Sequence, residues 1–147
     1  MSRIAIVSLI MRVGLGILFL VHGVKKFQMG LGNVAAWFDT AGVPGFLAYI
    51  AGPLELIGGI LLIAGLLTRY VSILLVLQLI GAIFIMKLPA GLLGNGQMAG
   101  YELDIAYILV GLHLAAADRT PLSIDGLFLF RSKDRAVSGR RKIMQRG

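Results

Sequence analysis

Cysteine is absent from the 147 residues of this sequence. Its absence excludes disulfide relays, thiolate nucleophiles, iron–sulfur clusters and thioether-linked haem, because each of these needs a cysteine sulfur. Thiol–quinone chemistry of the kind used by disulfide-forming membrane enzymes is excluded for the same reason. Any redox role of this chain therefore depends on a bound molecule or on a partner protein.

Charged residues are also scarce, at 14% against 58% hydrophobic residues, and the mean hydropathy is +0.89. This composition excludes a soluble globule. Four apolar stretches come near the roughly 20 residues that a helix needs to cross a bilayer. They cover about residues 4–24, 46–67, 70–88 and 101–117. We therefore predict an all-α integral membrane four-helix bundle over residues 1–118, with its first span retained, followed by a basic tail over residues 119–147.

Acidic residues are half as numerous as basic ones, 7 against 14, and the position of the excess argues against nucleic-acid binding. Eight basic residues follow the last apolar stretch, and Arg3 and Arg69 join them if both termini share one face. Lys25, Lys26 and Lys87 lie on the opposite side. This ten-to-three distribution predicts that both termini are cytoplasmic. The tail is expected to attract anionic lipids, mainly as a determinant of topology.

The segment between the first two apolar stretches, FQMGLGNVAAWFDTAGVPG, is too rich in glycine to span a membrane. It carries Trp37 and Phe38, and aromatic residues favour the headgroup level. We predict a short interfacial helix over residues 33–41 in this first outer loop. Many of the 20 glycines lie within the apolar stretches, where small residues allow close helix packing. The candidates are Gly14, Gly16, Gly58, Gly59, Gly81 and Gly111.

Four polar residues interrupt the apolar stretches: Arg12, Glu55, Gln78 and His113. Ionisable groups at bilayer depth are costly, so they persist where they pair, face the interior or have a function. Counted from the cytoplasmic ends, they fall at similar depths, which predicts one polar layer with Arg12 paired to Glu55. The layer is either a structural clamp, the wall of a quinone or small-molecule site with His113 exchanging protons, or a proton path.

A second polar group is expected at the outer ends of the stretches. It comprises His22, Lys25, Lys26, Lys87, Glu102 and Asp104. Glu102 shares a helix face with His113, which favours Glu102 as the interior acid and leaves Asp104 to complement the helix dipole. Lys25 and Lys26 are expected to be headgroup anchors. The alternative is that Lys26, together with His22, contacts a ligand. His22 with these acids is a weak metal signal, and no metal site is predicted.

Three segments give the chain a resemblance to a known family. They are RVGLGILFLVHGVKKF at residues 12–27, PLELIGGILLIAGLLTR at 53–69, and GYELDIAYILVGLHL at 100–114 with SID at 123–125. In order and spacing the sequence resembles the DoxX family. The residues at the positions that carry this pattern are Arg12, His22, Lys26, Glu55, Arg69 and Glu102.

The resemblance implies a small protein of the bacterial cytoplasmic membrane, in a family often given an oxidoreductase role. Relatives include the membrane subunit of a thiosulfate:quinone oxidoreductase and a partner of superoxide dismutase and a sulfurtransferase. A redox role would then rest on a partner or on a bound quinone or other small lipophilic reductant. Quinone reduction needs protons, which His113 or Glu102 would exchange, while Arg12, Glu55, Gln78, His22 and Lys26 would bind the ligand.

Three functions remain open at this point. The chain is a membrane subunit or partner of a quinone-linked oxidoreductase or oxidative-stress system; or it is a non-enzymatic scaffold whose basic tail recruits a soluble partner; or it is a small-solute or proton transporter that acts as a homo-oligomer. The sequence leaves open whether the chain itself catalyses a reaction.

Overall fold

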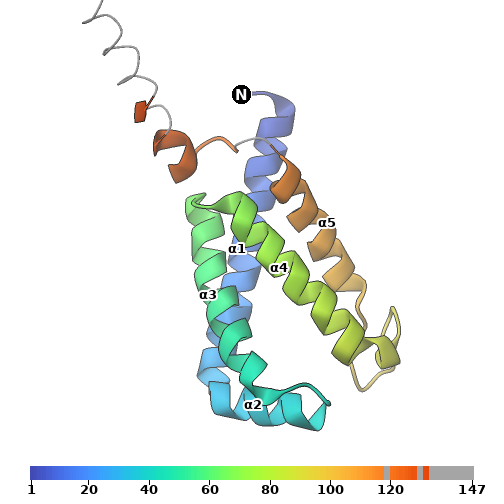
Figure 1. Ribbon diagram of the computed structural model, residues 1–147. Helices are drawn as coiled ribbons and strands as arrows, with labels where there is room; N and C mark the ends of the chain where they lie inside the picture. The colour runs from blue at the N-terminus through green and yellow to red at the C-terminus, as the bar shows by residue number, and fades with distance from the viewer. Residues whose placement is uncertain (118–119, 129–130, 133–147) are drawn as a thin grey trace, which may run out of the picture.

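The computed structural model describes residues 1–117, 120–128 and 131–132, and these residues form helices and turns without a β-strand. The helices α1 and α3 run antiparallel along one side of the molecule, and α4 and α5 diverge from them (Figure 1). The helices are α1 (Arg3–Met29), α2 (Leu31–Thr40), a 3₁₀ turn at Gly45–Leu47 leading into α3 (Ala48–Ala64), α4 (Thr68–Ala82) and α5 (Glu102–Ala116). Beyond α4 the chain continues helically through a π-helical turn at Ile83–Lys87 and a 3₁₀ turn at Leu88–Ala90.

Three of the described helical stretches are long and apolar enough to cross a membrane: Arg3–Met29, Gly45–Ala64 and Thr68–Ala90. The all-helical prediction is confirmed, and a membrane environment follows from these lengths. The first helix extends five residues beyond the predicted end at residue 24. The fourth predicted stretch forms α5, which has 15 residues and is shorter than the other three.

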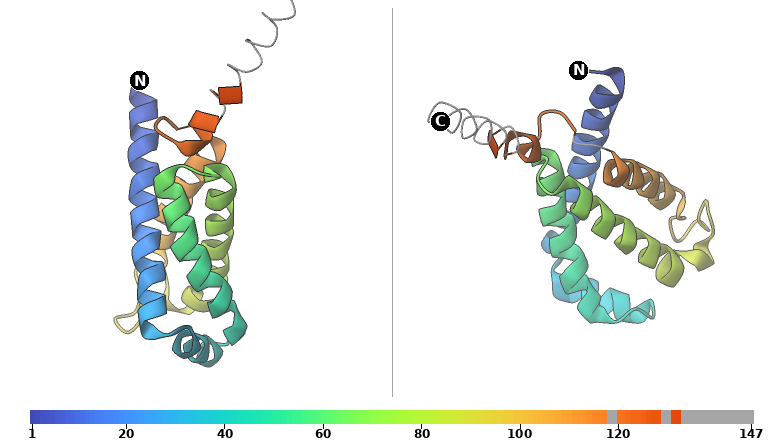
Figure 2. Two further views of the ribbon diagram at one scale, coloured as in Figure 1. Left: turned by 90° about the vertical axis from the view of Figure 1, so that its left-hand side faces the viewer. Right: turned by 45° about the horizontal axis from the view of Figure 1, so that its top comes forward.

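Close packing of α1 against α3 depends on glycines that face each other. A methyl group added to Gly59 would lie 2.6 Å from the backbone nitrogen of Leu20, and one added to Gly23 would lie 2.5 Å from that of Leu56. Figure 2 shows α1 and α3 lying side by side along much of their lengths. In lipid such backbone contact replaces the hydrophobic effect as the source of helix association.

The predicted packing glycines divide into two groups. Gly16, Gly58, Gly59 and Gly111 all face neighbouring atoms within 3.4 Å of an added methyl group, which confirms their packing role. A methyl group added to Gly14 or Gly81 would meet no atom of a neighbouring helix within 4 Å in the described part of the chain, so the packing prediction is wrong for these two.

Gly59→Val is expected to destabilise the protein by about 2–3 kcal/mol, because the added methyl groups must push the two backbones apart. Gly81→Val is the matched control, since it makes the same chemical change on a helix where the space is open. Unfolding of the purified protein in mixed micelles measures both effects. Equal losses for the two variants would show that helix propensity rather than packing sets the cost.

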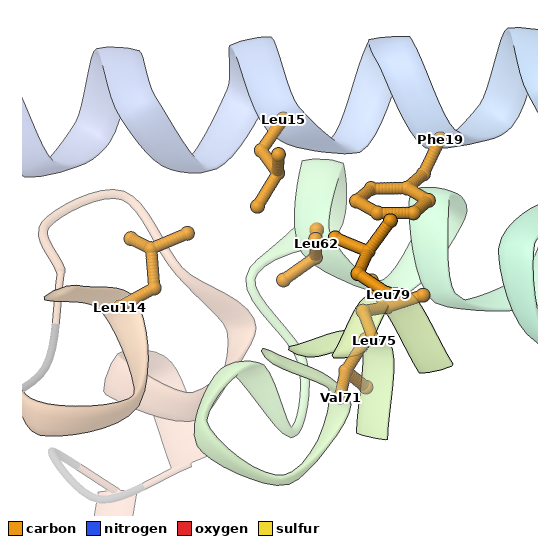
Figure 3. Packing of buried hydrophobic residues seen from close by; sticks show 7 residues of the cluster. All are labelled: Leu15, Phe19, Leu62, Val71, Leu75, Leu79 and Leu114. Carbon is orange, nitrogen blue, oxygen red and sulfur yellow. The ribbon is translucent and has the colours of Figure 1, made fainter. Parts of the chain in front are cut away.

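The main core lies where α1 meets α3, α4 and α5 (Figure 3). Leu15 and Phe19 of α1 point toward Leu62 of α3 and Leu75 of α4, and Leu114 of α5 approaches from the other side. The ring of Phe19 also lies 5.9 Å from that of Tyr107, between ring centroids. Through these contacts α1 shares one core with α3, α4 and α5.

A smaller core holds α2 across the end of the molecule opposite the N-terminus (Figure 1). Val34 and Phe38 of α2 pack with Val43 and Ala48, while Trp37 is exposed. A helix does form where the short interfacial helix was predicted, two residues earlier at its start. Its location at the membrane interface remains a prediction.

Candidate functional site

A buried carboxylate links three helices at the centre of the apolar region. Lys26 of α1 donates from Nζ to Glu55 Oε2 at 2.5 Å, and Gln78 of α4 donates from Nε2 to Glu55 Oε1 at 2.5 Å. The Glu55 side chain is only 7% exposed, against 23% for Lys26. We call Lys26, Glu55 and Gln78 the Glu55 cluster.

Two members of the Glu55 cluster lie near the middle of helical stretches that are long enough to cross a membrane. Glu55 is near the middle of the apolar stretch Gly45–Ala64, and Gln78 is near the middle of Thr68–Ala90. A charge at this depth is expensive to bury, and charge-assisted hydrogen bonds from both sides reduce that cost. Lys26 reaches the same level from the last turn of the long helix α1.

One polar atom in the Glu55 cluster is left over. Gln78 Oε1 is buried and has no hydrogen-bond partner among the described residues. A buried amide oxygen without a donor costs free energy that native proteins seldom accept without a reason. The cluster therefore offers a free acceptor beside a carboxylate, and a lysine with three N–H groups of which one is committed to Glu55.

The predicted pairing of Arg12 with Glu55 is wrong. Arg12 is 1% exposed and donates from its two terminal nitrogens to Thr120 Oγ1 at 2.6 Å and to the carbonyl of Leu122 at 2.8 Å. Its partners thus come from the segment after α5 rather than from α3. Of the predicted layer, only Glu55 and Gln78 meet directly.

The physical reason is the stagger between α1 and α3. The N-terminal end of α1 projects past the turn between α3 and α4, as Figures 1 and 2 show. Gly65, which follows α3, lies against the Arg12 guanidinium, so Arg12 is level with the end of α3 rather than with its middle. Lys26 is 14 residues further along α1, about 21 Å away, and it reaches Glu55 instead.

His113 lies near the same end as Arg12, in the last turn of α5. Its Nε2 and the hydroxyl of Ser8 on α1 form a hydrogen bond of 2.8 Å, and Ser8 is buried. No described residue connects this pair to the Glu55 cluster by a hydrogen bond. The single polar layer is therefore replaced by separate groups at two depths.

At the outer end the prediction of Glu102 as the interior acid is wrong, although Asp104 does lie in the first turn of α5 as predicted. Asp104 is the buried one, and Lys87 donates to its Oδ2 at 2.6 Å, whereas Glu102 is exposed. His22 and Lys25 are also exposed. Within the described ranges, no three His, Asp or Glu residues gather closely enough to hold a metal ion.

Sequence reasoning did not foresee the role of Asp125. Its carboxylate accepts from the backbone nitrogens of Leu67 at 3.1 Å and Thr68 at 3.3 Å, and so caps the start of α4. The SID motif at 123–125 and the GLLTR end of the segment at 53–69 are visible in the sequence, but neither predicts that the two meet. Most of the basic tail predicted at 119–147 lies outside the described residues.

Three relatives are similar to this chain. It is 42% identical over 126 residues, 86% of this chain and 89% of the relative, to a Bacillus subtilis (strain 168) protein named "Putative oxidoreductase CatD". It is 37% identical over 93 residues, 56% of this chain and 55% of the relative, to an uncharacterized membrane protein of Mycobacterium tuberculosis. It is 28% identical over 123 residues, 80% of this chain and 87% of the relative, to an uncharacterized protein of Haemophilus influenzae.

No solved structure gives a significant match to this chain. The DoxX profile matches residues 7–88, more than half of the sequence, including Arg12, Lys26, Glu55 and Gln78. Together with the relatives of similar length, this match shows that the chain belongs to the DoxX family of membrane proteins.

Proposed function

We propose that this protein is a membrane subunit or partner of a quinone-linked oxidoreductase or oxidative-stress system, with the Glu55 cluster as its quinone-binding site. The oxidoreductase name of the Bacillus subtilis relative supports the redox context. The chain has no cysteine that could relay electrons, and in this proposal a soluble redox partner supplies them. Quinone accepts two electrons and two protons per molecule reduced.

In this proposal α5 completes a four-span bundle in the bacterial cytoplasmic membrane, with both termini in the cytoplasm. Large apolar side chains of α5, among them Leu103, Leu109 and Leu112, are exposed, as expected for a helix that faces lipid. The distribution of basic residues supports the orientation. A homo-oligomer would cover part of this apolar surface.

The observation that carries the proposal is the unpartnered Gln78 Oε1 beside the carboxylate of Glu55. A quinone headgroup has carbonyl oxygens that accept hydrogen bonds, and Lys26 has N–H groups to donate. Its reduced form has hydroxyl groups, and one of these can donate a hydrogen bond to Gln78 Oε1. Glu55 is placed to exchange one of the two protons that accompany reduction, because it is hydrogen-bonded to both Lys26 and Gln78, and the second proton comes from water.

His113 and Glu102, the predicted proton-exchange groups, have less support than Glu55 in this role. His113 is bonded to Ser8 at the other end of the bundle, and Glu102 is exposed. Arg12 and His22 likewise lie outside the Glu55 cluster. The proposal therefore rests on Lys26, Glu55 and Gln78.

Gln78→Leu is expected to weaken binding of a short-chain quinol by about tenfold, since the hydrogen bond from the quinol hydroxyl to Gln78 Oε1 is worth about 1.5 kcal/mol. Equilibrium titration of the detergent-purified protein with the reduced forms of decyl-ubiquinone and a short-chain menaquinone measures the loss. Gln97→Leu is the matched control, because Gln97 is exposed in the loop before α5.

Absence of saturable quinone binding by the unsubstituted protein would contradict the proposal. The scaffold alternative would then require a soluble protein whose co-purification is lost when residues 131–147 are removed. The transporter alternative would require solute or proton flux in proteoliposomes that depends on Glu55.

A further inference from the structure

A pocket of about 480 Å³ opens at the end of the molecule that carries the N-terminus, well separated from the Glu55 cluster. Its walls are the start of α4, the end of α5 and the segment at 120–128. Thr68 is ten residues from Gln78 along α4, about 15 Å. The GLLTR and SID motifs of the sequence meet at this pocket.

The polar part of the pocket lining includes groups without a hydrogen-bond or ion-pair partner among the described residues. Thr68 Oγ1 is buried and has no hydrogen-bond partner in the described part of the chain. Arg69 next to it is exposed and forms no ion pair with any residue in the described ranges. Tyr70 adds an exposed phenol to the same part of the lining. A hydroxyl donor and a guanidinium at adjacent positions suit a phosphate group.

The carboxylate of Asp125 also lines the pocket, and its negative charge is already compensated. Both of its oxygens accept backbone N–H groups at the start of α4. The guanidinium of Arg12 attracts it from the other side. Arg12, Asp125 and Arg69 together carry a net positive charge, which leaves Arg69 available for an anion.

The lining also includes apolar side chains, those of Leu67, Leu114, Ala117 and Phe128. Leu67 and Phe128 are exposed, so the pocket has an apolar rim. The turn between α3 and α4 joins two helices of membrane-spanning length, which places the pocket at the membrane surface. A ligand for this pocket therefore has a phosphate headgroup and an apolar body.

We infer that this pocket binds an anionic phospholipid, with the phosphate on Thr68 and Arg69 and the start of an acyl chain along Leu114 and Phe128. The site is distinct from the quinone site proposed above, and from non-specific attraction by the basic tail. The bound lipid would contact the segment at 120–125, which lines the pocket and which Arg12 holds through its hydrogen bonds to Thr120 and Leu122.

Native mass spectrometry of the detergent-purified full chain tests this inference with phosphatidylglycerol and phosphatidylcholine of identical acyl chains. The unsubstituted protein is expected to retain phosphatidylglycerol in preference by about fivefold, and Arg69→Gln to abolish that preference. Arg69→Lys should keep most of it. Arg3→Gln is the matched control, since Arg3 is an exposed cation at the same end of the molecule and outside the pocket.

Thr68→Val is expected to reduce retention of both lipids, because its hydroxyl contacts the phosphate that they share. Equal effects of Arg69→Gln and Arg3→Gln would overturn the inference in favour of general surface charge. Displacement of phosphatidylglycerol by millimolar inorganic phosphate would overturn it in favour of a free-phosphate site. Quinone binding should be unchanged in Arg69→Gln, so either of the two proposals can be contradicted without affecting the other.

Discussion

Arg12→Met is expected to lower the free energy of unfolding by about 2–4 kcal/mol, one of the two largest effects of a single substitution in this protein. The substitution leaves the buried hydroxyl of Thr120 and the part-buried carbonyl of Leu122 without their donor, and a buried group that loses its partner costs about 1–3 kcal/mol. Removal of a buried charge offsets part of this loss. Unfolding in mixed micelles, followed by circular dichroism, measures the change.

Arg3→Met is the control for Arg12→Met, because Arg3 is exposed on the same helix. A double-mutant cycle between Arg12→Met and Thr120→Val should show coupling, since the two side chains bond directly. The cycle between Arg12→Met and Glu55→Gln should be additive within about 0.5 kcal/mol. Strong coupling in that second cycle would restore the Arg12–Glu55 pair and contradict the stagger of α1.

The effect of Arg12 extends beyond its own hydrogen bonds. Thr120 and Leu122 precede Asp125, whose carboxylate caps α4, so the segment at 120–125 connects α1 to the turn after α3. Leu122 and Leu67 both have positive φ angles, 51° and 52°, which non-glycine residues adopt only at a cost. Arg12 and Asp125 hold the two strained turns together.

The helices of this protein were predictable from its sequence, whereas most of the contacts between them were not. Apolar length alone identified the three long helices, because backbone groups in lipid must bond within a helix. Contacts depend on how far each helix is displaced along its axis. Counting residues from the end of each apolar stretch assumes that the helices end at the same level. The N-terminal end of α1 instead projects beyond α3, which moves Arg12 away from Glu55 and places Lys26 beside it.

The error over Asp104 and Glu102 has a similar origin. The two residues point to different sides of α5, so the prediction required knowing which side faces the protein. The prediction assumes that the face carrying His113 is the interior face, but His113 is only half-buried, and its partner Ser8 lies on α1. Lys87, at the end of the π-helical turn, faces Asp104 instead. Periodicity of a uniformly apolar helix does not distinguish protein from lipid.

Two conclusions drawn from residues alone do agree with the structure. Glu55 and Gln78 were expected to share a level, and they are joined by a hydrogen bond of 2.5 Å. The glycine pair after Glu55 was expected to pack, and both Gly58 and Gly59 do so against neighbouring helices. The contacts of Gln78 and Gly58 between α3 and α4 could be anticipated because these helices are joined by a short turn, which fixes their relative displacement.

The second large effect is expected at the Glu55 cluster. Lys26→Met should lower the free energy of unfolding by about 3 kcal/mol, because it leaves the buried carboxylate of Glu55 without its cation. Glu55→Gln in the same background should recover part of the loss, since the uncharged amide needs no counter-charge. The cycle between these substitutions is expected to show a coupling of about 1–3 kcal/mol.

Lys25 supplies the control for this cycle, because it is the adjacent lysine on α1 and is exposed. Lys25→Met should cost little and should combine additively with Glu55→Gln. If Lys25→Met and Lys26→Met destabilise the protein equally, both lysines act as headgroup anchors, and the ion pair with Glu55 contributes nothing measurable. If only Lys26→Met is costly and Glu55→Gln relieves it, the lysine's main role is to hold a charged carboxylate at mid-membrane depth. That charge is what the proposed proton exchange with a quinone requires.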